Sequence, residues 1–388
     1  MRVGIVGFGI GGATAGAAMA KRGIDFTIFE QAQAIREVGA GVATWPNTIR
    51  LLSRMGLSER LREIGCVVGT NPIRNRGGEV LHHVPPNSYD DTPGYYLHRA
   101  ELLEAIASLI PRERVRLGAQ CKKVEQNGDK VFVSLKSGEV EEFDVVIGAD
   151  GIKTVVADAV IGASQPIYSN LSAYRGLVSN EGPVRLDGCN LWTDRKKYFV
   201  AFPVSGGRLV NFVGVTPTEG LPEESWFMQG DVAALANEYK DWDPVVQRII
   251  SSAKETFRWG LYYRQPSQRI VEGRIALMGD AAPPMLIHAG QGMGQALEDG
   301  VALAVLLDGA TQATIVQRLL QYQELRLARA TAVQKLSRHN AQFLHEAVPL
   351  DPGEQRPERQ SPVEWIVNYD VEREAEKLLG SNGVASAS

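Results

Sequence analysis

The chain has 388 residues, a formal net charge of −4 and a sequence pI of about 6.0. This length is enough for two joined domains, and the slightly acidic balance argues against a nucleic-acid partner, which favours a basic face. Cys66, Cys121 and Cys189 lie far apart and form no C-x-x-C pair, which excludes the usual dithiol reductase and indicates a reducing compartment. No apolar run reaches about 18 residues, so we expect a cytoplasmic protein with no membrane contact.

The first thirty residues predict a βαβ unit that binds a dinucleotide. An apolar strand leads into the Gly-x-Gly-x-x-Gly motif of Gly7, Gly9 and Gly12, a helix of small residues follows, and a second strand ends at Glu30. Gly7 permits the tight turn, Gly9 lets a pyrophosphate approach the backbone, and Gly12 lets helix and strand pack closely. Glu30 stands eighteen residues after Gly12, where a carboxylate accepts hydrogen bonds from a ribose. These residues alone leave FAD and NAD both open.

The middle of the chain has the pattern of short strands. Alternation predicts strands over 121–126, 130–135, 139–143 and 145–148, and Asn127-Gly128 indicates a hairpin between the first two. His82 and His83 point to opposite faces of a strand and have no acid at ligand spacing, so we expect no metal. Residues from about 165 to 270 read as strands rich in aromatic residues, typical of a second sheet.

The last third contains a second motif that suits an electron-rich ligand. A strand over 275–278 ends at Gly279-Asp280, and a turn with Gly290 and Gly292 then opens a helix that runs to about 307. Such a helix end offers unpaired N–H groups and a positive dipole end, although an ordinary strand–loop–helix connection has the same pattern. A long helix is predicted over about 314–347, then a Pro-rich loop up to 362, and a flexible Ser/Ala/Gly tail from Ser381.

Three motifs in order resemble those of the class A flavoprotein aromatic hydroxylases, the family of p-hydroxybenzoate, salicylate and 6-hydroxynicotinate hydroxylases. They are the N-terminal glycine motif, Asp150-Gly151 after the strand over 145–148, and Gly279-Asp280. The resemblance covers nearly the whole chain. It implies an α/β fold in which a Rossmann-like FAD-binding domain is interleaved with a mixed β-sheet substrate domain and followed by C-terminal helices. The expected boundaries are 1–165 with 271–310, then 166–270, and a helical segment with a tail over 311–388.

The same resemblance implies FAD as cofactor and assigns contacts to it. Asp280 would contact the ribityl chain or ribose, and the helix start would face the flavin pyrimidine ring. A solvated surface loop around Gly41 and a solvated helix start at Arg99 are the alternatives. The expected cofactor residues are Gly7, Gly9, Gly12, Glu30, Arg36, Gly41, Arg99, Asp150, Asp280, Gly292 and Met293. No second glycine motif is present, so NADH or NADPH would bind transiently as the reductant. The family arginine after Asp-Gly-x-x-Ser is replaced by Ala157, which leaves the choice between the two coenzymes open.

The activity that the resemblance implies is hydroxylation of a small aromatic or heteroaromatic substrate with a carboxylate, using O2 and NAD(P)H through a flavin C4a-hydroperoxide. The candidate catalytic residues are His288, as a base for a phenolic substrate, and Tyr198, and the candidate substrate contacts are Arg175, Phe202, Met285 and Ile287. Arg175 has the alternative of a charge on the sheet surface. Pro283, Ile287 and Ala43 replace a histidine, a proline and a histidine of family members, which indicates a different substrate or base.

Other functions remain open from the sequence. An enzyme that inactivates a tetracycline-like antibiotic would share every FAD motif, and a flavin-binding protein without hydroxylase activity would keep them as well. A flavin halogenase is disfavoured, because Trp259-Gly-Leu-Tyr lacks the Trp-x-Trp-x-Ile-Pro segment. We expect a monomer or a homodimer.

Overall fold

The computed structural model describes residues 1–34, 40–86, 90–162, 165–218, 228–282, 284–345 and 364–385, with backbone alone over 381–385. Its first layer is a six-stranded sheet, parallel except for one edge strand. The strands, in spatial order, are β19 (Val271–Glu272), β20 (Ile275–Leu277), β12 (Val145–Gly148), β1 (Arg2–Val6), β2 (Asp25–Glu30) and β8 (Val115–Leu117). Most of their residues are fully buried, as expected for parallel strands covered on both faces.

Helices cover this sheet and pack against one another. Helix α1 (Ile10–Lys21) contacts α4 (Arg99–Ala107) and α7 (Gly292–Leu307), and α7 contacts α8 (Ile315–Leu344) and α10 (Val371–Ala385). An antiparallel sheet of β9 (Cys121–Asn127), β10 (Lys130–Leu135) and β11 (Val140–Phe143) contacts β1 and β12. The predicted hairpin at Asn127-Gly128 is confirmed, since Lys130 pairs with Asn127 and Gly128 has a φ of 61°.

The second layer is an eight-stranded sheet, antiparallel apart from one pair in its interior. Its order is β17 (Gln229–Gly230), β18 (Thr256–Tyr263), β13 (Ile167–Ser179), β16 (Leu209–Pro217), β15 (Tyr198–Val204), β14 (Asn190–Thr193), β5 (Asn71–Asn75) and β6 (Val80–Val84). The sheet therefore includes two strands from outside the expected range 166–270, because β5 pairs in parallel with β14 and β6 pairs with β5.

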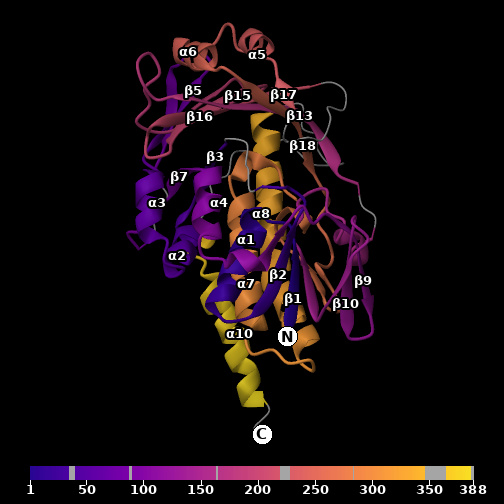
Figure 1. The fold of residues 1–388 in the computed structure, drawn as a ribbon. Helices are drawn as coiled ribbons and strands as arrows, with labels where there is room; N and C mark the ends of the chain where they lie inside the picture. Colours follow the sequence, from indigo (N-terminus) through magenta and orange to yellow (C-terminus); the bar gives the residue numbers. More distant parts are fainter. Residues whose placement is uncertain are drawn as a thin grey trace, which may run out of the picture.

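One face of the wide sheet is closed by two short helices, α5 (Val232–Glu238) and α6 (Pro244–Ser252), which lie on its outer side in Figure 1. Between these helices and the sheet lies an aromatic core of Trp192, Phe199, Phe212, Tyr239 and Trp242. The other face points to the six-stranded sheet and its helices, and the C-terminal end of α8 reaches it (Figure 1). A small sheet of β3 (Gly41–Thr44), β7 (Tyr95–His98) and β4 (Cys66–Val67) lies beside it, with α2 (Pro46–Arg54) and α3 (Ser58–Ile64) below.

The C-terminal segment consists of α9 (Glu364–Val367) and α10, and α10 packs on α7 and α8. Helix α10 extends past Ser381 to Ala385, and the flexible tail expected from Ser381 stays a prediction. Short 3-10 turns complete the described chain: η1 (Arg112–Arg114), η2 (Ala157–Ala159), η3 (Gly279–Ala281) and η4 (Ile287–Ala289).

Candidate active site

The carboxyl ends of four neighbouring parallel strands bring the distant motifs to one edge of the six-stranded sheet. Gly7 follows β1, Glu30 ends β2, Asp150 follows β12, and Asp280 follows β20. This edge is where ligands bind in open α/β sheets. The sequence could place each residue at a strand end, but only the strand order puts the four ends side by side.

The three motif glycines differ in what surrounds them. Gly7 has a φ of 105°, and a Cβ there would lie 2.4 Å from the carbonyl oxygen of Ala149. A Cβ on Gly12 would lie 2.0 Å from the carbonyl oxygen of Gly7. Around Gly9, by contrast, no heavy atom lies within 4 Å of the added Cβ. Gly7 and Gly12 are therefore required by the packing of the protein itself, and Gly9 leaves room for a ligand beside the helix start.

Glu30 is held against this loop by backbone groups. Its Oε2 accepts a hydrogen bond of 2.8 Å from the N–H of Phe8, and its Oε1 accepts one of 2.8 Å from the N–H of Ala32. Each carboxylate oxygen has a second lone pair for a further donor. The side chain is half-buried, so it is both oriented and reachable.

Asp150 organises the turn after β12. Its Oδ2 accepts a hydrogen bond of 2.8 Å from the N–H of Val155, while its buried Oδ1 has no hydrogen-bond partner among the described residues. Burial raises the pKa of Asp150. The hydroxyl of Thr154 accepts bonds from the N–H groups of Val156 and Ala157, so it caps the following turn.

Asp280 lies close to Arg99, which begins α4. Its side chain is exposed, yet burial of the surrounding region raises the pKa of its carboxyl, and the nearby Arg99 guanidinium acts in the opposite direction. Arg99 begins α4 and is anchored there, since its N–H donates to the carbonyl of Ala40 over 2.8 Å. The structure thus brings together Arg99 and Asp280, which are far apart in the sequence.

Helix α7 starts next to the same edge. Gly292 is its first residue and Met293 its second, and both are half-buried. A Cβ on Gly11, in the N-terminal motif, would lie 3.2 Å from the Cβ of Ala296 on α7 and 3.2 Å from the terminal methyl of Met278. The predicted helix N-terminus and the predicted dinucleotide loop are therefore neighbours. Met285 lies near Gly292 and packs with Ala289, Val333, Leu336 and Ile366, on the side of α8.

Gly41 has a packing role that the sequence did not reveal. Its N–H donates to Oδ1 of Asn211 over 2.7 Å, and a Cβ there would lie 2.5 Å from Cε2 of Phe202. Phe202 in turn stacks on Tyr96, with ring centroids 4.6 Å apart. Gly41 thus joins β3 to the wide sheet, and its contact with the cofactor stays a prediction. Arg36 lies outside the described residues.

The register between strands decides which residues of the wide sheet face the domain of the six-stranded sheet. Directly opposed residues share a face, and Tyr198, Val215, Ala173 and Trp259 form one row across four strands. Arg175 lies on the same face, is only 5% exposed, and places its guanidinium carbon 4.9 Å from the centre of the Trp259 ring. The alternative of a surface charge for Arg175 is therefore wrong, because this face is covered by the neighbouring domain.

His288 is surrounded by aromatic rings beneath this face. Its ring makes edge contacts with Tyr198, at 5.6 Å between centroids, and with His345, at 5.1 Å, and Ile287 packs into the cluster that contains Tyr198. Burial, and then the nearby His345, hold the pKa of His288 well below its usual value. Neither ring nitrogen of His288 has a hydrogen-bond partner in the described part of the chain. Burial raises the pKa of Tyr198 above its usual value.

His345 is a residue that the sequence analysis missed. It is fully buried at the C-terminal end of α8, its ring lies 5.2 Å from that of Tyr198, and its Nδ1 is 3.0 Å from the carbonyl oxygen of Lys196. Burial lowers its pKa to about 4. The predicted helix placed His345 near a helix end, but no local signal shows that this end reaches the wide sheet.

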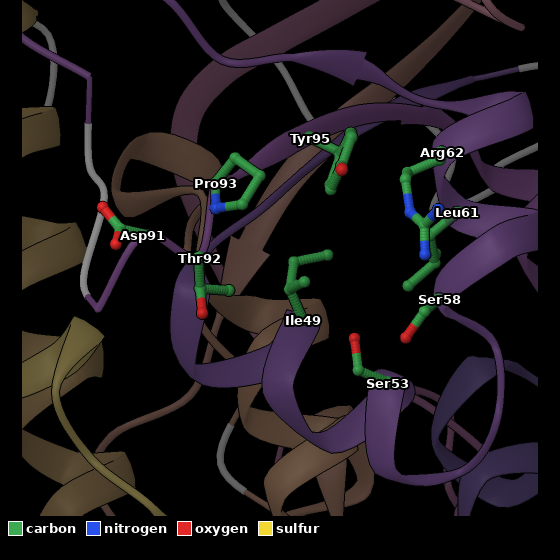
Figure 2. Close-up of a pocket in the computed structure, with 9 residues that line it drawn as sticks. All are labelled: Ile49, Ser53, Ser58, Leu61, Arg62, Asp91, Thr92, Pro93 and Tyr95. Carbon is green, nitrogen blue, oxygen red and sulfur yellow. The ribbon is translucent and has the colours of Figure 1, made fainter.

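A pocket of about 220 Å³ lies between α2, α3 and the segment before β7. Figure 2 shows Arg62 and Leu61 on one side of it and Thr92 and Pro93 on the other. None of the residues predicted as functional lines this pocket. Within the described residues no group of three or more acidic, His or Cys side chains has a metal-binding arrangement, and no helix combines the length and apolarity needed to cross a membrane.

The residues at the sheet edge fit an FAD molecule. The open space at Gly9 suits a pyrophosphate beside a helix start, and the oriented carboxylate of Glu30 suits a ribose diol. Asp280 lies near Arg99 and offers acceptors for the hydroxyls of a sugar-like chain.

Comparison with known proteins supports the same cofactor. The family described as FAD binding domain matches residues 1–337. A 3-amino-4-hydroxybenzoate 2-monooxygenase of Streptomyces cremeus is 35% identical over 363 residues, which are 89% of this chain and 88% of that protein. A 6-hydroxynicotinate 3-monooxygenase of Pseudomonas fluorescens is 29% identical over 87% of this chain and 91% of its own length. The crystal structure of Klebsiella pneumoniae HpxO complexed with FAD and uric acid has a TM-score of 0.79 and 26% identity, with 89% of each chain covered.

These matches span the motifs at the sheet edge as well as both large sheets. The family match reaches from the first strand into α8, and the two relatives are both named monooxygenases. The Rossmann-like fold and the FAD cofactor expected from the sequence are confirmed. The chain belongs to the FAD-dependent aromatic hydroxylases and is a flavoprotein monooxygenase of that family.

Proposed function

We propose that this enzyme hydroxylates a small aromatic or heteroaromatic carboxylate that already carries a ring hydroxyl, with O2 and NADH or NADPH as co-substrates. The observation that carries the proposal is Arg175, a cation buried on the sheet face that points to the FAD domain. The guanidinium already lies over the Trp259 ring, and a cation beside an aromatic ring offers an aromatic carboxylate both a charge-assisted hydrogen bond and a surface to pack on. The substrates named for two relatives, 3-amino-4-hydroxybenzoate and 6-hydroxynicotinate, have this chemistry.

In this proposal FAD lies along the carboxyl edge of the six-stranded sheet. Its pyrophosphate passes Gly9, its ribose meets Glu30, and its ribityl chain meets Asp280 and Arg99. Asp150, Gly292 and Met293 complete the site, with α7 pointing its N-terminus at the flavin. Bound FAD supplies the activation of dioxygen, and the protein orients the ring and excludes water.

His288 is the proposed base. Its lowered pKa keeps the imidazole neutral at neutral pH, so it has a lone pair for the proton of a ring hydroxyl, and removing that proton makes the ring a stronger nucleophile. Tyr198 keeps its proton under the same conditions and is therefore proposed as a hydrogen-bond donor. Phe202, Ile287 and Met285 are proposed as apolar substrate contacts. Since Phe202 packs on Tyr96 and Met285 packs towards α8, Ile287 has the strongest support of the three.

A screen of hydroxybenzoates, aminobenzoates and pyridine carboxylates tests the proposal. A true substrate should stimulate NADH or NADPH oxidation and give a product heavier by one oxygen, with little hydrogen peroxide. Oxidation that yields only hydrogen peroxide would identify an effector rather than a substrate. If carboxylates never outperform the matching phenols, the proposed carboxylate recognition is wrong. A cytoplasmic location and a monomeric or homodimeric state stay predictions from the sequence.

A further inference from the structure

Asp299 links the predicted FAD contact at Asp280 to the buried interior of the protein. Its carboxylate is 3% exposed, and its Oδ2 accepts a hydrogen bond of 2.9 Å from the N–H of Gly279. Gly279 has a φ of 56° and directly precedes Asp280 in the turn η3. Asp299 lies on α7, twenty residues further along the chain, so its bond ties the turn after β20 to the helix that starts beside it.

The second oxygen of Asp299 is fixed by a buried arginine. Nε of Arg326 donates to Oδ1 of Asp299 over 2.6 Å, its Nη1 to Glu298 over 2.6 Å, and its Nη2 to Gln295 over 2.8 Å. Arg326 is 0% exposed, and its planar fork leaves it one orientation that satisfies all three acceptors. Glu298 is held independently by Arg329 and Asn47. Asp299 depends on Arg326 alone for its compensating charge among the described residues.

We propose that Asp299, oriented by Arg326, is a positioning residue for FAD binding: it fixes the turn at Gly279 so that the Asp280 carboxylate faces the cofactor hydroxyls. This inference rests on the proposed contact between Asp280 and FAD. Because the N–H of Gly279 donates to Asp299, it is not available to the ligand. The same hydrogen bond holds the turn in its left-handed conformation before the cofactor binds. Such preorganisation reduces the ordering cost of binding.

Asparagine cannot replace Asp299 without a conflict. Both partners of the carboxylate, the N–H of Gly279 and Nε of Arg326, are donors. A carboxylate has two acceptor oxygens, but an amide has one oxygen and one NH2 group. In either orientation, the amide introduced by Asp299→Asn would therefore set a donor against a donor, at nearly the same size as the native side chain.

A double-mutant cycle on FAD affinity separates positioning from general stability. Full-length apoprotein of the wild type, Asp280→Ala, Asp299→Asn and the double variant is titrated with FAD by fluorescence. Asp280→Ala should weaken FAD binding by about 10- to 100-fold, from the loss of a charge-assisted hydrogen bond. Asp299→Asn should weaken it by about tenfold, and the double variant should stay within about threefold of the weaker single variant.

Tyr322→Phe is the matched structural control. The Tyr322 hydroxyl is buried and donates over 2.8 Å to the carbonyl of Leu277, two residues before Gly279, so its loss weakens the same strand end without freeing the turn. Its effect should multiply with that of Asp280→Ala. If Asp299→Asn gives no soluble protein, Arg326→Lys tests the same link, since it keeps the charge and removes the fork.

The outcomes distinguish this inference from the proposed function. Unchanged FAD affinity in Asp299→Asn, or losses that multiply in the double variant, would overturn the positioning role and leave the Asp280 contact intact. Unchanged affinity in Asp280→Ala alone would overturn the contact and, with it, the positioning role. The inference is supported if the losses of FAD affinity caused by Asp280→Ala and Asp299→Asn do not multiply in the double variant, whereas those caused by Asp280→Ala and Tyr322→Phe do.

Discussion

Replacing Arg326 by methionine should destabilise the protein through one identifiable group, the carboxylate of Asp299. Methionine has a similar length, so the space left by the guanidinium is partly filled. Glu298 would keep Arg329 and Asn47 as partners. Among the described residues, Asp299 would keep one hydrogen-bond partner, the N–H of Gly279. Breaking a buried ion pair on one side typically costs about 3–5 kcal/mol.

The pH dependence identifies the cause of this loss. Burial already raises the pKa of Asp299 beside Arg326, and removing the guanidinium would raise that pKa further. A folded-state pKa above the unfolded value means that the folded variant binds more protons, so its stability falls as pH rises. Below about pH 4 the carboxyl is protonated in both states and the penalty vanishes, whereas above that pH the cost of holding the proton in the folded variant increases. The destabilisation should therefore grow with pH, by at most about 1.4 kcal/mol per pH unit, until the pH passes the raised pKa of Asp299.

Denaturant unfolding of wild type and Arg326→Met, with FAD in excess, at about pH 5.5 and about pH 8 measures this difference. Adding Asp299→Asn to Arg326→Met should restore most of the stability at the higher pH, because the neutral amide can still accept from Gly279. An equal loss at both pH values, or no rescue by the second substitution, would show that lost packing and not the buried charge causes the effect.

Three other variants test contacts at the site. His288→Ala should lower the hydroxylation rate with FAD still bound, and it should remove an acidic limb of the pH–rate profile that lies below the usual range of a histidine, because the pKa of His288 is lowered. An unchanged rate and profile would exclude this base. Arg175→Met should raise KM for a carboxylate substrate by about 10-fold or more and leave KM for the decarboxylated analogue unchanged. An equal rise in KM for both compounds would refute carboxylate binding by Arg175. Gly41→Ala should lower the free energy of unfolding by about 1–3 kcal/mol, because the added Cβ would meet Phe202. The control Gly188→Ala adds its Cβ in open space and should lower it less. Equal losses in the two variants would contradict the close packing at Gly41.

Local patterns predicted the strands and helices that carry the cofactor. The predicted strands over 130–135 and 145–148 match β10 and β12, and the long predicted helix over 314–347 matches α8 within a few residues. Period-two alternation and apolar runs are local features, so the sequence displays them directly. The wide sheet was predicted less completely, because β5 joins β14 across more than a hundred residues and no local pattern encodes that pairing.

Two elements had signals that the sequence analysis did not use. Asp231 caps α5 by accepting from the N–H of Ala233, and Asp243 caps α6 by accepting from the N–H of Val245, with Pro244 as the first helical residue. An acidic cap followed by proline is a recognisable helix start. Likewise, Glu298 and Asp299 interrupt the apolar run of α7, and consecutive buried acids predict a buried cation nearby. The identity of that cation, Arg326, depends on the packing of α8 against α7.

The site facing the substrate depends on a choice that alternation alone leaves open. In β15 and its neighbours, side chains point alternately to the two faces, and the strand register puts Tyr198, Phe202 and Trp259 on one face and Trp192 and Phe212 on the other. Alternation within one strand shows neither this register nor which group faces the FAD domain, because both groups are apolar and both faces are covered. Helices α5 and α6 decide which face is turned to the FAD domain, because they cover one face and bury its aromatic residues in a hydrophobic core. The opposite face then receives Arg175, a buried cation that such a core could not accommodate cheaply, and it is this face that His288 approaches from η4.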